Sequence, residues 1–271
     1  MRRLAFVMLS ALLLFGACGE SQAPSPTIEP GGLALVGAQL IDGSGAAPVQ
    51  DSVVVIRDGR IERAGSRETT EVPAGAEVID VSGKTVMPGL VNLHVHYRGG
   101  PEDIARQFRT QLYYGVTTGR SIGSDSADAV PFLLEANAGR SGFPRAYTAG
   151  LGFSHPGGFN AAGRNAPTTE EEARSLVRAQ VDLGVHFIKM WVNEVGEPGL
   201  KITPEMRTVI VDEALQNGAV PVAHIDDEAD GRQLIEAGLR DFLHSTVSVS
   251  YTHLRAHETD SYLVCRLLLE K

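Results

Sequence analysis

The feature that most constrains the fold is a repeated alternation of helix and strand patterns between residues 88 and 247. Gly115, Gly184, Gly218 and Gly238 each separate a helical pattern from a short apolar run, and glycine suits the left-handed position that ends a helix. Such repeats predict βα units around a parallel sheet. Six strands are expected, near residues 90, 116, 146, 186, 220 and 241. They fit an open doubly wound sheet or most of a (β/α)8 barrel, which needs eight strands.

The residues before this repeat, 33–87, predict a separate small domain of antiparallel strands. The valine-rich run 52–56 and the run 61–64 flank Asp58-Gly59, which is a strong signal for a two-residue hairpin turn. A second pair of short runs, 77–81 and 84–87, is joined through Ser82-Gly83 and is expected to form another hairpin.

The N-terminus has the layout of a secretory signal peptide over residues 1–17. Two arginines precede an apolar run of 14 residues, Leu4 to Ala17, which is too short to cross a bilayer as a helix. The segment ending at Cys18 resembles a bacterial lipobox, except that Phe15 stands where leucine is usual. It implies a lipid anchor on Cys18, a tether over 18–32, and export to a bacterial cell or outer membrane facing the periplasm or exterior. A plain signal peptide with an incidental cysteine is the alternative.

The charge balance argues against nucleic acid as a partner. Asp and Glu number 33 against 24 Lys and Arg, so the formal net charge is −9, and no basic run occurs. Phosphate binding needs clustered cations. The two cysteines are too few for a disulfide framework.

Four of the eight histidines stand where predicted strands end. His94 and His96 close the first strand, and alternation along a strand places both on one face. His224 and His244 close the fifth and sixth strands. Active sites of barrels assemble at these carboxyl ends, and paired neutral imidazoles bind metal ions. The alternative is that each histidine only caps its strand.

Lys189 is expected to point into the barrel. In the run 185–189 it shares a face with Val185 and Phe187, whereas His186 points the other way and is not expected to be a ligand. A buried ammonium must be neutralised, modified or paired. A salt bridge to a carboxylate elsewhere in the chain is the alternative to a chemical role.

These motifs together resemble the amidohydrolase superfamily, and most closely its imidazolonepropionase and Xaa-Pro dipeptidase-like branch. Residues 86–96 (VMPGLVNLHVH) are similar to the first barrel strand of that family, and the later motifs follow in the family's order: 115–118, 187–189, 222–224 and 241–244. The resemblance covers residues 33 to about 247. It implies an α/β fold, a partial (β/α)8 TIM barrel of about six βα units over 88–247, and a small N-terminal β-sandwich over 33–87.

The resemblance also implies a chemistry. His94 and His96 would bind a first divalent ion, His224 and His244 a second, with zinc expected. Lys189, carboxylated by carbon dioxide, would be a catalytic bridging ligand. The implied activity is hydrolysis of amide or cyclic amide C–N bonds in small-molecule or dipeptide-like substrates. Asn92 departs from the family, which usually has aspartate there, and no aspartate following an eighth strand is found.

Residues 248–271 do not continue the pattern and look like a translated sequencing adaptor. We therefore expect a non-native tail on a C-terminally truncated chain that is itself inactive. A helical zinc site built from His253 and His257 with Glu258 is the weaker interpretation. A non-catalytic, surface-anchored binding lipoprotein on the same fold remains an alternative function, and an inactive fragment is another.

Overall fold

The computed structural model describes residues 32–159, 161–194 and 199–244. Cys18, the expected leader and tether, and the tail with its histidines lie outside these residues. The chain separates into two compact units that meet between Pro88 and Gly89, and each is described by itself. Within the described ranges, no helix has the length and apolar character needed to cross a membrane.

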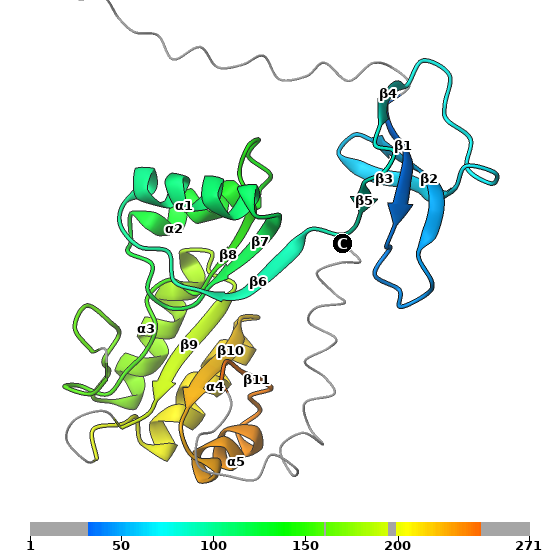
Figure 1. Ribbon diagram of the computed structural model, residues 1–271. Helices are drawn as coiled ribbons and strands as arrows, with labels where there is room; N and C mark the ends of the chain where they lie inside the picture. Colours follow the sequence, from blue (N-terminus) through cyan, green and yellow to red (C-terminus); the bar gives the residue numbers. More distant parts are fainter. Residues whose placement is uncertain (1–31, 160, 195–198, 245–271) are drawn as a thin grey trace, which may run out of the picture. The chain divides into compact units, whose positions relative to one another are not determined.

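The first unit is a single mixed sheet (Figure 1). Its strand order is β3-β2-β1-β4, and β5 pairs with the far end of β1. Alternate residues of β1 face a small core with Ala34, Val36, Val53 and Val55. The strands are β1 (Leu33–Leu40), β2 (Val49–Arg57), β3 (Arg60–Ser66), β4 (Glu77–Asp80) and β5 (Thr85–Val86).

The first expected hairpin is confirmed and the second is wrong. Asp58 and Gly59 both have positive φ, 50° and 71°, and connect β2 to β3. By contrast, β4 and β5 each pair in parallel with β1 instead of with each other. Both stay beside β1 because Ser82, between them, packs against Gly37, where a Cβ atom would lie 2.3 Å from Ser82 Oγ. The described strands of this unit therefore form one sheet and not two facing sheets.

The second unit contains the six predicted parallel strands in sequence order. Pairing joins β6-β7-β8 and β9-β10-β11. The two groups are linked because His186 N donates to Thr148 O (2.8 Å) and Phe153 N donates to Lys189 O (2.7 Å). The strands are β6 (Leu90–Val95), β7 (Val116–Ser121), β8 (Arg145–Thr148), β9 (Phe187–Val192), β10 (Val220–Ile225) and β11 (Asp241–Phe242).

A buried ion pair shows that this sheet curves into a partial barrel. Arg120 on β7 pairs with Asp241 on β11, four strands away, and both side chains are nearly buried. Arg120 also donates to Leu93 O at 2.7 Å, and its guanidinium lies 5.1 Å from the centre of the Phe187 ring. Side chains from β7 and β11 can meet only across a concave surface. The open doubly wound sheet is therefore excluded, and the partial TIM barrel is confirmed.

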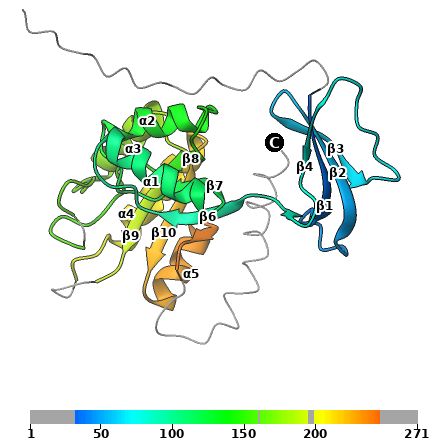
Figure 2. The same cartoon turned by 45° about the horizontal axis from the view of Figure 1, so that its top comes forward.

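Five helices connect the strands and pack on one another and on the sheet (Figures 1 and 2). The predicted glycines Gly115, Gly184, Gly218 and Gly238 have φ between 75° and 107°, as expected after a helix. The helix α2 was not predicted, because Asp128 does not cap it and it carries no polar face that would mark its period. The helices are α1 (Pro101–Tyr113), α2 (Ala129–Asn137), α3 (Glu170–Asp182), α4 (Pro204–Gln216) and α5 (Glu228–Glu236).

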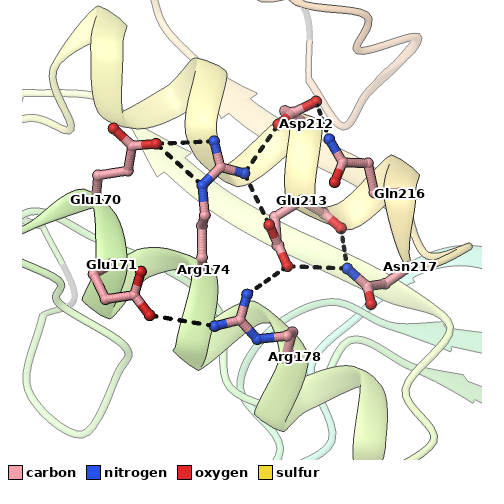
Figure 3. A network of polar contacts seen from close by, with 8 residues as sticks. All are labelled: Glu170, Glu171, Arg174, Arg178, Asp212, Glu213, Gln216 and Asn217. Carbon is pink, nitrogen blue, oxygen red and sulfur yellow. Dashed lines mark hydrogen bonds and ion pairs between the residues drawn. The ribbon is translucent and has the colours of Figure 1, made fainter.

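Helices α3 and α4 are joined by a network of ion pairs (Figure 3). Glu213 on α4 accepts from Arg174 and Arg178 on α3, at 2.8 Å each, and its side chain is only 7% exposed. Arg174 also contacts Asp212 and Glu170. Because Glu213 is held by two guanidinium groups, its pKa lies below the usual range. This network fixes the outer layer that backs β9 and β10.

Candidate active site

The structure brings the four predicted histidines together at the carboxyl ends of three strands. The Nε2 atoms of His94 and His96, at the end of β6, lie 3.1 Å apart. The His244 ring follows β11 and lies 4.6 Å from the His94 ring and 4.5 Å from the His224 ring, between centroids. His224 belongs to β10. Residues separated by 150 positions thus share one cluster.

The cluster favours neutral imidazoles. Burial, followed by the charge of Lys189, lowers the pKa of His94 and of His96 to about 4. The same two causes lower the pKa of His224 and His244. At neutral pH the rings therefore keep a free nitrogen lone pair, which is the form that binds metal ions.

Lys189 on β9 points into the barrel, as its strand phase predicts. Its side chain is 1% exposed, and Nζ has no hydrogen-bond partner among the described residues. Burial, together with the charge of Arg120, lowers its pKa well below the ordinary value. The aliphatic stem fits against Gly123 and Gly152, where a Cβ atom would lie 2.6 and 3.1 Å from Lys189 Cγ. The alternative of a salt-bridged lysine is not what the structure shows.

The donor chemistry fits a divalent cation, although the side chains are not in a ligating arrangement. Within the described part of the chain, no group of three His, Cys, Asp or Glu side chains is placed to hold a metal ion. Four neutral imidazoles and one buried amine without a partner are nevertheless the atom types that zinc-like ions bind, once the amine becomes an anion.

Neighbouring polar groups orient the histidines. Ser124 Oγ lies 3.0 Å from His96 Nδ1, which leaves Nε2 facing the cluster. Asn92 Oδ1 accepts from the backbone N–H of His94 at 3.1 Å. The amide thus orients the backbone at the position where the resembled family usually has aspartate. Contacts of this kind fix the ring orientation of metal-binding histidines.

Comparison with known proteins supports the resemblance to the amidohydrolase superfamily. No family model matches the chain. It is 36% identical over 99 residues to the dihydroorotase of Pelotomaculum thermopropionicum, covering 36% of this chain and 21% of that protein. It is 41% identical over 70 residues to the imidazolonepropionase of Methylobacterium nodulans, covering 25% and 17%.

Among solved structures, one assigned as a prolidase from Bifidobacterium longum superposes with a TM-score of 0.72 at 30% identity, covering 83% of this chain and 56% of that one. These similarities support a relationship of the chain to the amidohydrolase superfamily. The chain spans about a fifth of the curated relatives that it matches and about half of this neighbour.

A buried carboxylate next to Ser124 was also not predicted. Asp125, four residues after the end of β7, is fully buried and accepts from Ser121 Oγ (2.5 Å) and Thr148 Oγ1 (2.6 Å). Burial raises its pKa to about 6, although the two hydrogen bonds lower it. Its place directly after a barrel strand was the available signal. It ties β7 to β8 beside the loop that carries Ser124.

The loops that follow β8 and β9 differ in their contributions to the cluster. The Phe159 ring lies 6.2 Å from the His224 ring, so the loop after β8 reaches the cluster. Asn193 is 4% exposed and its Oδ1 has no partner among the described residues, whereas Glu194 is exposed. His186 lies away from the cluster, 3.1 Å from Asn137 Nδ2, as predicted.

Proposed function

We propose that the parent protein is a metal-dependent hydrolase that cleaves amide or cyclic amide C–N bonds in small-molecule or dipeptide-like substrates. The observation that carries this proposal is the cluster of four neutral imidazoles beside the buried amine of Lys189, which has no hydrogen-bond partner among the described residues. The names of the relatives, dihydroorotase and imidazolonepropionase, support a hydrolase of this class.

In this proposal, His94 and His96 hold one divalent ion, and His224 and His244 hold a second, with zinc as the first candidate. When bound, such ions lower the pKa of a water molecule toward 7 and polarise the scissile carbonyl. Ser124 and Asn92 orient their histidines, and the aromatic ring of Phe159 restricts access of water to the cluster from the β8 loop.

Lys189 supplies the anionic ligand after carboxylation. Because burial lowers its pKa, a larger share of the amine is neutral than in an exposed lysine, and a neutral amine has a free lone pair. That lone pair forms an N–C bond with carbon dioxide, the electron pair of one C–O π bond moves onto oxygen, and one proton leaves the nitrogen to solvent, so the neutral amine becomes a carbamate anion. The exchange removes the unfavourable buried ammonium and would supply an anionic ligand for the divalent ions.

The test uses the full-length parent protein. Purified protein is analysed for metal content and assayed against dipeptides and cyclic amides before and after chelation. Lys189→Ala should lose activity and regain part of it with bicarbonate or short carboxylic acids. Lys84→Ala, an exposed lysine of the first unit, is the matched control. Full activity of Lys189→Ala, or turnover that survives complete metal removal, would refute the proposal.

We also propose that the protein is exported and lipid-anchored through Cys18, on a bacterial cell or outer membrane facing the periplasm or exterior. The basic start, the 14-residue apolar run and the lipobox-like segment support this proposal. Cys18→Ser should abolish incorporation of labelled fatty acid and release the protein from the membrane fraction. Unchanged labelling of that variant would contradict it.

A further inference from the structure

Arg164, in the loop between β8 and α3, is a half-buried cation that has no carboxylate partner among the described residues. Among the described arginines that are buried or half-buried, Arg57, Arg120, Arg174 and Arg207 each pair with a carboxylate. Arg164 makes no ion pair with any described residue, and its Nε atom is buried without a hydrogen-bond partner. Burial lowers its pKa, and the charge of Asp125 acts in the opposite direction.

The guanidinium of Arg164 is held in a fixed place beside the histidine cluster. Its Cζ atom lies 5.2 Å from the centre of the Trp191 ring, which is itself 4% exposed. Its Nη2 atom donates to Ser124 Oγ at 3.1 Å, and that oxygen lies 3.0 Å from His96 Nδ1. One hydroxyl group therefore separates the cation from a ring of the proposed metal site.

The described residues offer this guanidinium no carboxylate that is free of other hydrogen bonds. Asp125 is the acid whose charge favours the charged form of Arg164, but its two carboxylate oxygens already accept from Ser121 and Thr148. A guanidinium stacked on an aromatic ring presents a planar set of N–H donors that matches a carboxylate in two parallel hydrogen bonds. An anionic group on a ligand would supply the missing partner.

We propose that Arg164 binds the carboxylate of the substrate and selects N-acyl amino acids or dipeptides, whose carboxylate lies close to the scissile C–N bond, over neutral amides. The inference rests on the proposed function, because it takes the histidine cluster as the reacting centre. Arg164 acts as a specificity-determining residue: it holds the end of the substrate while the amide carbonyl reaches the cluster.

The test measures binding separately from turnover, in the full-length protein. N-acetylglycine and N-acetylglycinamide differ only in the carboxylate, and their dissociation constants are measured by NMR titration. Arg164→Met should raise the dissociation constant of N-acetylglycine at least tenfold and change that of N-acetylglycinamide by less than twofold. Arg164→Lys should retain part of the preference for N-acetylglycine over N-acetylglycinamide. Arg145→Met, an exposed arginine at the opposite end of β8, is the matched control and should change neither constant.

Three other outcomes would overturn the inference. Equal weakening of both ligands would make Arg164 a positioning residue for Ser124 and His96, and unchanged binding would remove any role in recognition. If the wild-type protein prefers the amide, the substrate class is wrong. Should Arg164→Met unfold, the comparison of Arg164→Lys with wild type still decides. In one further outcome, the wild-type protein binds N-acetylglycine but hydrolyses none of the substrates, while Arg164→Met selectively loses that binding. This result would support carboxylate binding by Arg164 and refute the proposed function.

Discussion

Lys189→Met should stabilise the metal-free protein while it abolishes activity. The Nζ atom is buried at 1% exposure without a hydrogen-bond partner, and an unsatisfied buried donor costs about 1–3 kcal/mol. Methionine keeps a stem of similar length against Gly123 and Gly152 and removes the amine. We therefore expect the free energy of unfolding to rise by about 1–3 kcal/mol.

Lys189→Ala separates the amine from its stem. It removes the same donor but also leaves a cavity, and truncating a buried chain of this size costs about 2–5 kcal/mol. The alanine variant should therefore be less stable than the methionine variant by about 2 kcal/mol or more. Gly59, in the exposed turn of the first unit, provides a control substitution, Gly59→Asn, at a position where asparagine tolerates the positive φ.

The assay is urea unfolding of the full-length protein at pH 7 after chelation. With a slope of about 2 kcal/mol per M, the methionine variant should shift the midpoint upward by about 1 M. The pH dependence gives a second check. Unfolded Lys189 binds its proton more tightly than native Lys189, because burial lowers the native pKa, so wild-type stability rises with pH up to about 10.5.

The advantage of methionine should therefore shrink as pH increases from 7 toward 10. A methionine variant that is less stable than wild type would refute the reasoning, since it would mean that a partner stabilises the ammonium. An advantage that stays constant with pH would also contradict it.

Three further outcomes are expected. His94→Ala combined with His96→Ala should lower the bound metal by about one ion per chain in elemental analysis; unchanged stoichiometry would remove both from the site. Arg207→Met should destabilise by about 3 kcal/mol in urea unfolding, because Arg207 is 1% exposed and its removal leaves Asp230 partly uncompensated. Since burial raises the pKa of Asp125 from 3.8 to about 6, the native state binds the extra proton and stability falls as pH rises through that window, by up to about 3 kcal/mol. Asp125→Asn should flatten this dependence, and an unaltered pH profile would contradict it.

The sequence by itself determined the features that depend on local patterns. The six parallel strands, the glycines that end the helices and the Asp58-Gly59 turn follow from backbone preferences of a few neighbouring residues. The inward phase of Lys189 and the outward phase of His186 follow from the two-residue period of a strand. Because parallel strands end at the same edge, histidines at strand ends had to come together.

Only the tertiary structure decided which groups compensate one another across the barrel. The parallel pairing of β4 and β5 with β1, the joining of Arg120 to Asp241, and the bonding of Asp125 to Thr148 all link residues far apart in the chain. That Arg164 has no acidic partner in the described part of the chain is also visible only in three dimensions. Whether a buried charge is paired depends on every side chain that surrounds it in space. Those side chains come from different helices, strands and loops, and the order of these elements along the sequence does not give the distances between them.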